Sequence, residues 1–258
     1  MKQVRPADVK EIYELRAETI DYFFPDRDDE IDFWEEIASD FGKDILHLMC
    51  GTGEISVGLA KKGFEVTALD LTEAMMYVAE DRIEEEGVEN IELINGDARH
   101  FNLDKKFDFA FVSTGDFHHL TSEDDINKFL AKSYAHLRPG GALAIELFPL
   151  PDDDFKRDQR EFDPLRAPPE GIDIWKTNQT SYDSETQMLE IKEELFVDKK
   201  DEGKGKRGQY EIQLKLFSKE KMQDILEDAG FNNIKFLENH QYTPYLKDSD
   251  TWVVIAER

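Results

Sequence analysis

The stretch DILHLMCGTGE, residues 44–54, decides the fold, because a short apolar run leads directly into two closely spaced glycines. An apolar run of this length next to glycine predicts a buried strand. Gly51 and Gly53 then allow the backbone to come close to a ligand, and the helix that follows offers unpaired N–H groups. A G-x-G of this kind also occurs in ordinary strand-to-helix turns, so the surrounding pattern has to separate the two interpretations.

Strands and helices alternate on both sides of this turn. The residues favour helices at about 7–20, 29–41, 54–62, 72–87, 122–137 and 218–229, and strands at 44–49, 64–70, 91–96, 107–114, 142–148, 231–238 and 251–257. The central strands are short and apolar on both faces, which is typical of a parallel sheet covered by helices. We therefore predict an α/β fold, a Rossmann-like doubly wound and mostly parallel sheet.

The alternation stops at residues 149–217. Residues 149–171 are rich in proline and charge and predict a loop or a mobile lid, whereas 172–183, 187–198 and 209–218 alternate apolar and polar side chains as half-buried antiparallel strands do. The predicted domains are therefore an N-terminal helical cap (1–43), a core (44–150 and 218–258) and an inserted antiparallel β subdomain (151–217).

Charge and composition exclude several partners. The chain has 32 basic and 58 acidic residues, a formal charge of −26, which repels nucleic acid and anionic lipid. Its single cysteine cannot form an internal disulfide, which fits a reducing compartment. No apolar run approaches the ~18–20 residues that cross a bilayer. The charged N-terminus has no signal-peptide core, so we expect a cytoplasmic protein that binds neither nucleic acid nor membrane.

Two carboxylates follow the strands next to the glycine turn. Asp70 ends the second strand and can accept hydrogen bonds from ribose hydroxyls. Asp97 follows the third strand and can accept one from an adenine amino group, with Ala98 leaving room for the ring. The alternatives are a helix-capping role for Asp70 and an Asx-turn at Asp97. Because ligands bind at the carboxyl ends of parallel strands, the pattern predicts a nucleoside site.

With these positions identified, the chain resembles the class I S-adenosylmethionine-dependent methyltransferases. The resemblance covers nearly the whole chain and rests on residues 45–80, 94–101, 107–120, 137–148 and 217–231. The competing dinucleotide fingerprint G-x-G-x-x-G has Ser56 in place of its third glycine. Two positions depart from the methyltransferase pattern, His47 where an acid is usual and Met49 where glycine is frequent.

The resemblance implies S-adenosyl-L-methionine as cofactor, S-adenosyl-L-homocysteine as product and a set of cofactor contacts. Gly51 and Gly53 would lie along the methionine part, Asp70 would bind the ribose, and Leu71 and Ala98 would contact the adenine faces. The full set of expected cofactor residues is His47, Cys50, Gly51, Thr52, Gly53, Asp70, Leu71, Met75, Gly96, Asp97, Ala98, Arg99, Ser113, Thr114 and Gly115.

The acceptor side is predicted from fewer residues. His118 is the candidate general base, since a histidine titrates near neutral pH, and the alternative is a structural histidine in its loop. Tyr22, Glu146 and Trp175, with His118, are the candidate acceptor-binding residues. In similar small-molecule enzymes the inserted β segment covers the acceptor pocket. The Cys and His spacing fits no zinc site, so no metal is expected.

We therefore predict an enzyme that transfers a methyl group to N or O of a small molecule. A non-catalytic protein that binds the nucleoside, and a methyltransferase for protein or RNA, are the alternatives. The negative charge argues against RNA.

Overall fold

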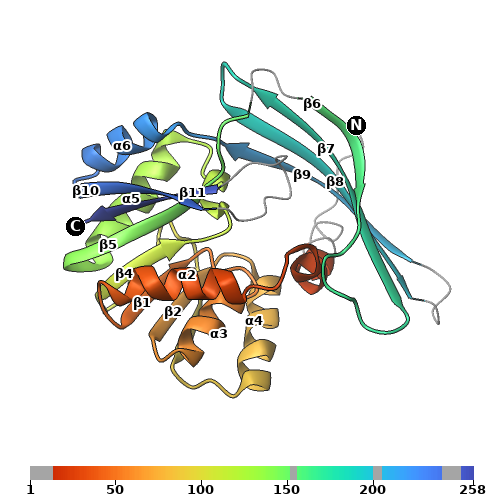
Figure 1. Cartoon of the computed structure of the whole chain (residues 1–258), viewed down its shortest axis with the longest axis horizontal. Helices are drawn as coiled ribbons and strands as arrows, with labels where there is room; N and C mark the ends of the chain where they lie inside the picture. The colour runs from red at the N-terminus through yellow and green to blue at the C-terminus, as the bar shows by residue number, and fades with distance from the viewer. Residues whose placement is uncertain (1–13, 152–155, 200–204, 240–250) are drawn as a thin grey trace. The chain divides into compact units, whose positions relative to one another are not determined.

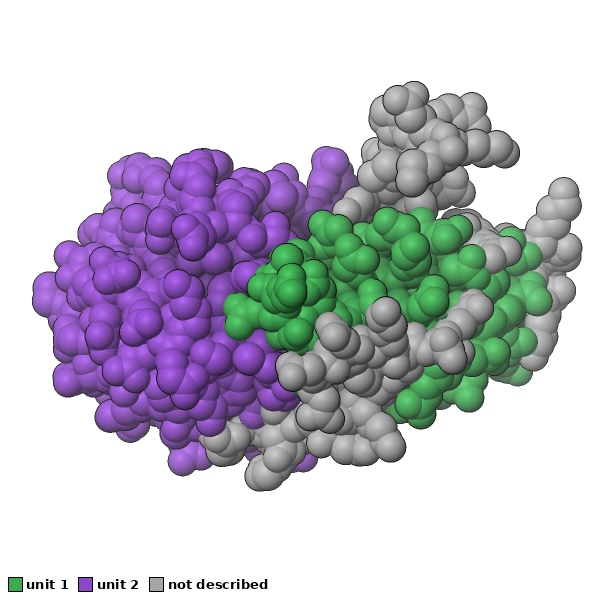
Figure 2. Space-filling view, turned by 90° about the horizontal axis from the view of Figure 1, so that it is seen from above, with its two compact units in different colours: residues 1–26, 151–214 green, residues 27–150, 215–258 purple. Residues whose placement is uncertain are grey.

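The computed structural model describes residues 14–151, 156–199, 205–239 and 251–258. The chain forms two compact units, which Figure 2 shows in different colours. The β unit comprises residues 1–26 and 151–214, and the α/β unit comprises 27–150 and 215–258. The N-terminal division thus falls after residue 26, whereas the sequence placed it after residue 43, because α2 packs on the parallel sheet.

The α/β unit is built on a seven-stranded sheet in the order β10-β11-β5-β4-β1-β2-β3. Its strands are β1 (Asp44–Leu48), β2 (Glu65–Asp70), β3 (Ile91–Asn95), β4 (Phe107–Val112), β5 (Leu137–Leu147), β10 (Asn232–Asn239) and β11 (Thr251–Glu257). The five strands from β5 to β3 are parallel, and β11 is antiparallel to both of its neighbours. The predicted Rossmann-like sheet is confirmed.

Helices cover both faces of this sheet (Figure 1). The helices are α2 (Asp28–Ser39), α3 (Glu54–Lys61), α4 (Glu73–Glu86), α5 (Glu123–His136) and α6 (Lys219–Asp228). Side chains of β4 show the two faces, because Phe109 and Phe111 pack with α2 and α3 while Ala110 and Val112 pack with α5. This alternation buries both faces of the strand, as the apolar run FDFAFV predicted.

The β unit contains a four-stranded sheet in the order β6-β7-β8-β9. Its strands are β6 (Lys156–Phe162), β7 (Ile172–Asp183), β8 (Met188–Lys199) and β9 (Lys206–Lys215). The pairs β6–β7 and β7–β8 are antiparallel, as predicted for the insert. The prediction of a continuous loop at 149–171 was wrong at β6. Its sequence KRDQREF has no apolar alternation, because this is a charged edge strand.

Two further boundaries differ from the sequence prediction. Residues 14–19 are helical and continue into the 3-10 helix η1 (Ile20–Phe23), whereas a loop was expected from residue 21. The first part of the predicted helix 7–20 lies outside the described residues. Residues 138–141, which the sequence prediction left between a helix and a strand, belong to β5, whose pairing with β4 is irregular between Phe107 and Phe109.

Candidate functional site: the carboxyl ends of the parallel strands

The glycine turn follows β1 and bends tightly before α3. Gly51 and Gly53 have φ of 56° and 74°, conformations that favour glycine. A Cβ on Gly51 would meet no atom within 4 Å, so the backbone there is open, whereas a Cβ on Gly53 would lie 2.9 Å from Ala79 Cβ of α4. Met49 also has a positive φ, 59°, which explains why glycine is frequent at this position in the family that the sequence resembles.

Asp70 is bound to the glycine turn. Its Oδ2 accepts the Gly51 N–H at 2.9 Å, and its Oδ1 accepts the Thr72 N–H at 2.8 Å. Thr72 is the N-cap residue of α4, but its side chain makes no capping hydrogen bond. The carboxylate therefore fixes the turns after β1 and after β2 relative to each other.

The turn after β3 joins the same group. Gly96 donates its N–H to the Asp70 carbonyl oxygen at 2.9 Å. Asn95 Nδ2 donates to the carbonyls of Asp70 and Leu71 at 3.0 and 3.1 Å. The structure thus brings together the ends of β1, β2 and β3 as predicted, and it adds Asn95, which the sequence did not single out. An amide that ends a strand gave no distinctive signal.

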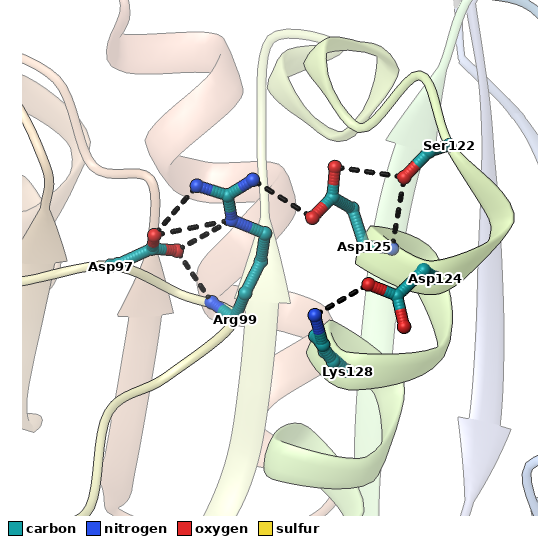
Figure 3. Close-up of polar contacts among 6 residues, drawn as sticks. All are labelled: Asp97, Arg99, Ser122, Asp124, Asp125 and Lys128. Carbon is teal, nitrogen blue, oxygen red and sulfur yellow. Dashed lines mark hydrogen bonds and ion pairs between the residues drawn. The ribbon is translucent and has the colours of Figure 1, made fainter.

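Asp97 is held by Arg99, as Figure 3 shows. Arg99 Nε lies 2.9 Å from Oδ1, Nη2 lies 2.7 Å from Oδ2, and the Arg99 N–H also binds Oδ1 at 2.9 Å. The last contact is the Asx-turn that the sequence left open. Hydrogen bonding to Arg99 lowers the pKa of Asp97, so its carboxylate is ionised at neutral pH.

Arg99 also connects this carboxylate to α5. Its Nη1 binds Asp125 Oδ1 at 2.8 Å, and Ser122 Oγ donates to Asp125 Oδ2 at 2.9 Å (Figure 3). Asp125 and Ser122 were not predicted as site residues, since their sequence signal was that of a helix start. The contacts form a continuous chain from the first turn of α5 to the end of β3.

His47 is buried, and both of its ring nitrogens have partners. Nδ1 lies 2.7 Å from Ser56 Oγ, Nε2 lies 3.0 Å from Ser113 Oγ, and the ring stacks on Phe111 at 4.1 Å. Burial lowers the pKa of His47 to about 3, so the imidazole is neutral. The residue thus links β1, α3 and the end of β4 by hydrogen bonds, without the negative charge that an acid would bring.

The carboxylate of Glu146 lies on β5, which is two strands away from β1 in the sheet. Glu146 is buried, and its Oε2 accepts the Thr114 N–H at 2.7 Å while Oε1 accepts from Thr251 Oγ1 at 3.0 Å. Burial, and then the charge of Glu30, raise the pKa of Glu146 to about 8. Arg27 pairs with Glu30 at the start of α2 and partly opposes this shift.

The turn after β4 depends on Glu146 and on a glycine. Thr114 and Gly115 have φ of 59° and 74°. A Cβ on Gly115 would lie 2.4 Å from Phe148 Cζ, so no larger residue fits there without displacing the ring. Ser113, Thr114 and Gly115 therefore take a fixed conformation at the same edge of the sheet as the glycine turn.

His118 does not have the surroundings of a general base. It is completely buried, its Nδ1–H donates to the Lys215 carbonyl at 2.6 Å, and its Nε2 accepts the Phe148 N–H at 2.8 Å. Burial lowers its pKa to about 3. With both nitrogens bound to the backbone, the side chain has the structural role that the sequence left as the alternative.

The remaining predicted residues differ in environment. Leu71 is 63% exposed next to Asp70, while Cys50, Thr52, Met75 and Ala98 are buried. Burial raises the pKa of the Cys50 thiol well above its usual range, so Cys50 is not a thiolate. Tyr22 and Trp175 belong to the β unit, and Trp175 stacks on Phe196 at 5.0 Å.

In the part of the chain that the structure describes, no helix is long and apolar enough to span a bilayer. Among the same residues, no group of three or more His, Cys, Asp or Glu side chains is arranged to hold a metal ion.

Comparison with known proteins relates this part of the chain to a protein family. Residues 45–141, which run from β1 into β5, match the family model of the methyltransferase domain. This segment is a class I methyltransferase domain. The putative methyltransferase YqeM of Bacillus subtilis is 34% identical over 104 residues, which are 40% of this chain and 41% of that protein. The chain thus matches less than half the length of this relative.

Solved structures are similar to the whole chain, and at this low sequence identity the similarity concerns the fold. DesVI of Streptomyces venezuelae has a TM-score of 0.72 at 19% identity, and the alignment covers 98% of both chains. CalS10, an amino pentose methyltransferase from Micromonospora echinaspora, has a TM-score of 0.69 at 19% identity and is covered completely, as is this chain. Both units are therefore found together in known methyltransferase folds.

Proposed function

We propose that the chain transfers a methyl group from S-adenosyl-L-methionine to N or O of a small molecule. The observation that carries the proposal is the hydrogen bond from the Gly51 N–H to Asp70 Oδ2, at 2.9 Å. It joins the open glycine turn to the carboxylate expected to bind a ribose, at the carboxyl ends of adjacent parallel strands, where α/β sheets bind their ligands.

The residues fit the methionine, ribose and adenine parts of the cofactor. The open backbone at Gly51 leaves room for the methionine part, and Asp70 offers carboxylate oxygens that two N–H groups hold in place. Leu71 is an exposed apolar side chain directly after Asp70, as a surface for a flat base requires. Asp97 is ionised and oriented by Arg99, so it can accept the adenine amino group.

The bound cofactor would supply a methyl group already activated by a sulfonium. The protein then mainly has to align the acceptor atom with that methyl group, and alignment alone contributes several kcal/mol. We assign this positioning to the turn at Ser113–Gly115, which Glu146 fixes through the Thr114 N–H. No general base is assigned to His118, because both of its nitrogens are bound to backbone groups.

A small acceptor agrees with the known activity of proteins of similar fold and with the charge. CalS10 is described as an amino pentose methyltransferase. The formal charge of −26 opposes a long-range approach to RNA. We therefore favour a small-molecule acceptor over a protein or RNA acceptor.

Equilibrium titration tests the cofactor part of the proposal. We expect S-adenosylhomocysteine to bind with a saturable heat signal, and Asp70→Ala to weaken it by about 1–3 kcal/mol, the scale of an unpaired polar group. Lys61→Gln is a suitable control, because Lys61 pairs with Glu86 on the surface. No binding at millimolar ligand would end the proposal.

The second candidate is a nucleoside-binding protein without turnover. Neutral His47 at a position that is usually acidic is the observation that favours it. Transfer of a labelled methyl group from the cofactor to a panel of small amines and alcohols separates the two. Saturable cofactor binding with no transfer to any acceptor would favour the second candidate.

A further inference from the structure

A group of buried polar side chains lies on one face of the sheet in the β unit. β7 alternates strictly, and its buried face carries Ile174, Lys176, Asn178, Thr180 and Tyr182. The facing positions of β8 are Leu189, Ile191, Glu193, Leu195 and Val197. Apolar side chains are the rule on such a face, so the amide, the ammonium and the carboxylate in its middle are exceptional.

Asn178 is the clearest exception. It is 2% exposed, and neither Oδ1 nor Nδ2 has a hydrogen-bond partner. It lies directly opposite Glu193 in the β7–β8 ladder, and Glu193 Oε2 lies 3.1 Å from Lys176 Nζ. A carboxamide buried with both atoms unpartnered is strongly disfavoured unless a ligand or ordered water binds it.

Aromatic side chains of the same unit lie against Lys176 and against the apolar residues of this face. Lys176 Nζ lies 4.5 Å from the centre of the Phe23 ring, which comes from η1. Tyr210 on β9 has a buried hydroxyl without a hydrogen-bond partner, and the Arg16 guanidinium lies 5.3 Å from the centre of its ring. Few polar groups among aromatic and apolar surfaces are typical of a small-molecule site.

The chemistry of these groups selects a ligand class. The charges of Lys176 and Glu193 cancel, so the pair does not favour a ligand with net charge. Asn178 presents a donor and an acceptor side by side, and a hydroxyl group can serve both. Phe23 and Tyr210 provide flat apolar faces, which suit the C–H face of a ring.

We propose that Asn178, together with Lys176, Glu193 and Tyr210, binds a neutral polyhydroxylated ring compound, of the monosaccharide or amino-sugar type. All four residues belong to the β unit, so this site goes beyond the proposed function of the α/β unit. The helical segment at residues 14–23 packs on the same face of the sheet, since its Leu15 and Phe23 pack with Ile174 and Leu195.

The test compares Asn178→Leu with Gln179→Leu, which replaces an exposed amide on the opposite face of the same strand. The probes are glucose, glucosamine, galactosamine and myo-inositol at millimolar concentration, with hexylamine as an apolar amine. Thermal shift and calorimetry report binding, and S-adenosylhomocysteine is titrated separately on every variant.

We expect at least one hydroxylated probe to bind the wild type saturably and hexylamine not to bind. Asn178→Leu should lower the affinity for that probe about tenfold or more, since a site built to bind hydroxyls depends on its polar groups. It should also leave the melting temperature unchanged or higher, and the affinity for S-adenosylhomocysteine unchanged. Gln179→Leu should alter none of these quantities.

Three results would overturn the inference. They are no binding of any hydroxylated probe to the wild type, equal affinity in Asn178→Leu, or a lower melting temperature in Asn178→Leu, which would show that the amide serves the fold through water. The paired change Lys176→Met with Glu193→Leu is a second variant of the same site, for which the same expectations hold. The titration of S-adenosylhomocysteine distinguishes a failure of this site from a failure of the proposed function.

Discussion

Arg99 binds both carboxylate oxygens of Asp97, with Nε 2.9 Å from Oδ1 and Nη2 2.7 Å from Oδ2. Two parallel contacts of this kind fix the orientation of a carboxylate as well as its charge. Arg99 is fixed in turn by Asp125 on α5 (Figure 3). The residue expected to bind adenine is therefore oriented before any ligand arrives.

Arg99→Gln should weaken recognition of the adenine amino group. Without the two contacts Asp97 samples several rotamers, and we expect an affinity loss of about 1 kcal/mol for S-adenosylhomocysteine, the scale of a net hydrogen bond. The analogue with hypoxanthine in place of adenine lacks the amino group, so its affinity should change less. Calorimetry with both ligands measures this difference. Lys128→Gln, which breaks the exposed pair with Asp124, is the control, and equal losses for both ligands would contradict the prediction.

Asp70→Asn should reduce both stability and cofactor affinity. Two backbone N–H groups, from Gly51 and Thr72, donate to the two carboxylate oxygens, and an amide can accept only one of them. We expect a loss of about 1–3 kcal/mol in the free energy of unfolding, the cost of an unsatisfied buried polar group. Urea denaturation measures it, and an unchanged midpoint would show that the turn does not need this carboxylate.

The sequence predicted the sheet because strand and helix patterns are repeated and local. It also placed Gly51, Asp70 and Asp97 at strand ends, since parallel strands bring their carboxyl ends to one edge of a sheet. The sequence did not predict the role of a side chain correctly where that role depends on burial. A histidine after β4 is equally consistent with a base and with a structural residue, and only the bonds of His118 to Lys215 and Phe148 separate them. The partners of Arg99 and Glu146 come from distant segments, which no local pattern encodes.

Glu146 should make the stability of the protein depend on pH between about 4.5 and 8. Its pKa is about 8 in the folded protein against an ordinary 4.5, so the folded state holds a proton that the unfolded state releases. The resulting stability is present below about pH 4.5 and is lost as the pH rises to about 8, with a slope of up to ~1.4 kcal/mol per pH unit. His47 and His118, with a pKa of about 3, act oppositely and only below their ordinary 6.5.

Glu146→Gln isolates this effect, because the amide stays neutral and can still accept the Thr114 N–H. Between pH 6.5 and 8 the wild type should lose stability relative to the variant, as measured by urea denaturation at each pH. The charges of Arg27, just before α2, and of Glu30 on α2 act on Glu146, and both are unchanged in the comparison. Parallel stability curves for the two proteins would rule out an elevated pKa at this residue.

His118→Phe should destabilise the fold without changing the pH dependence of methyl transfer. The change keeps a flat aromatic ring next to Phe148 and Phe217 but leaves the Lys215 carbonyl and the Phe148 N–H without their partner. Two buried groups left unsatisfied cost about 2–6 kcal/mol together. A base at position 118 would instead leave stability nearly unchanged and remove an ionisation from the pH profile of kcat/KM. Urea denaturation and the rates at several pH values, measured on the same preparation, distinguish the two roles.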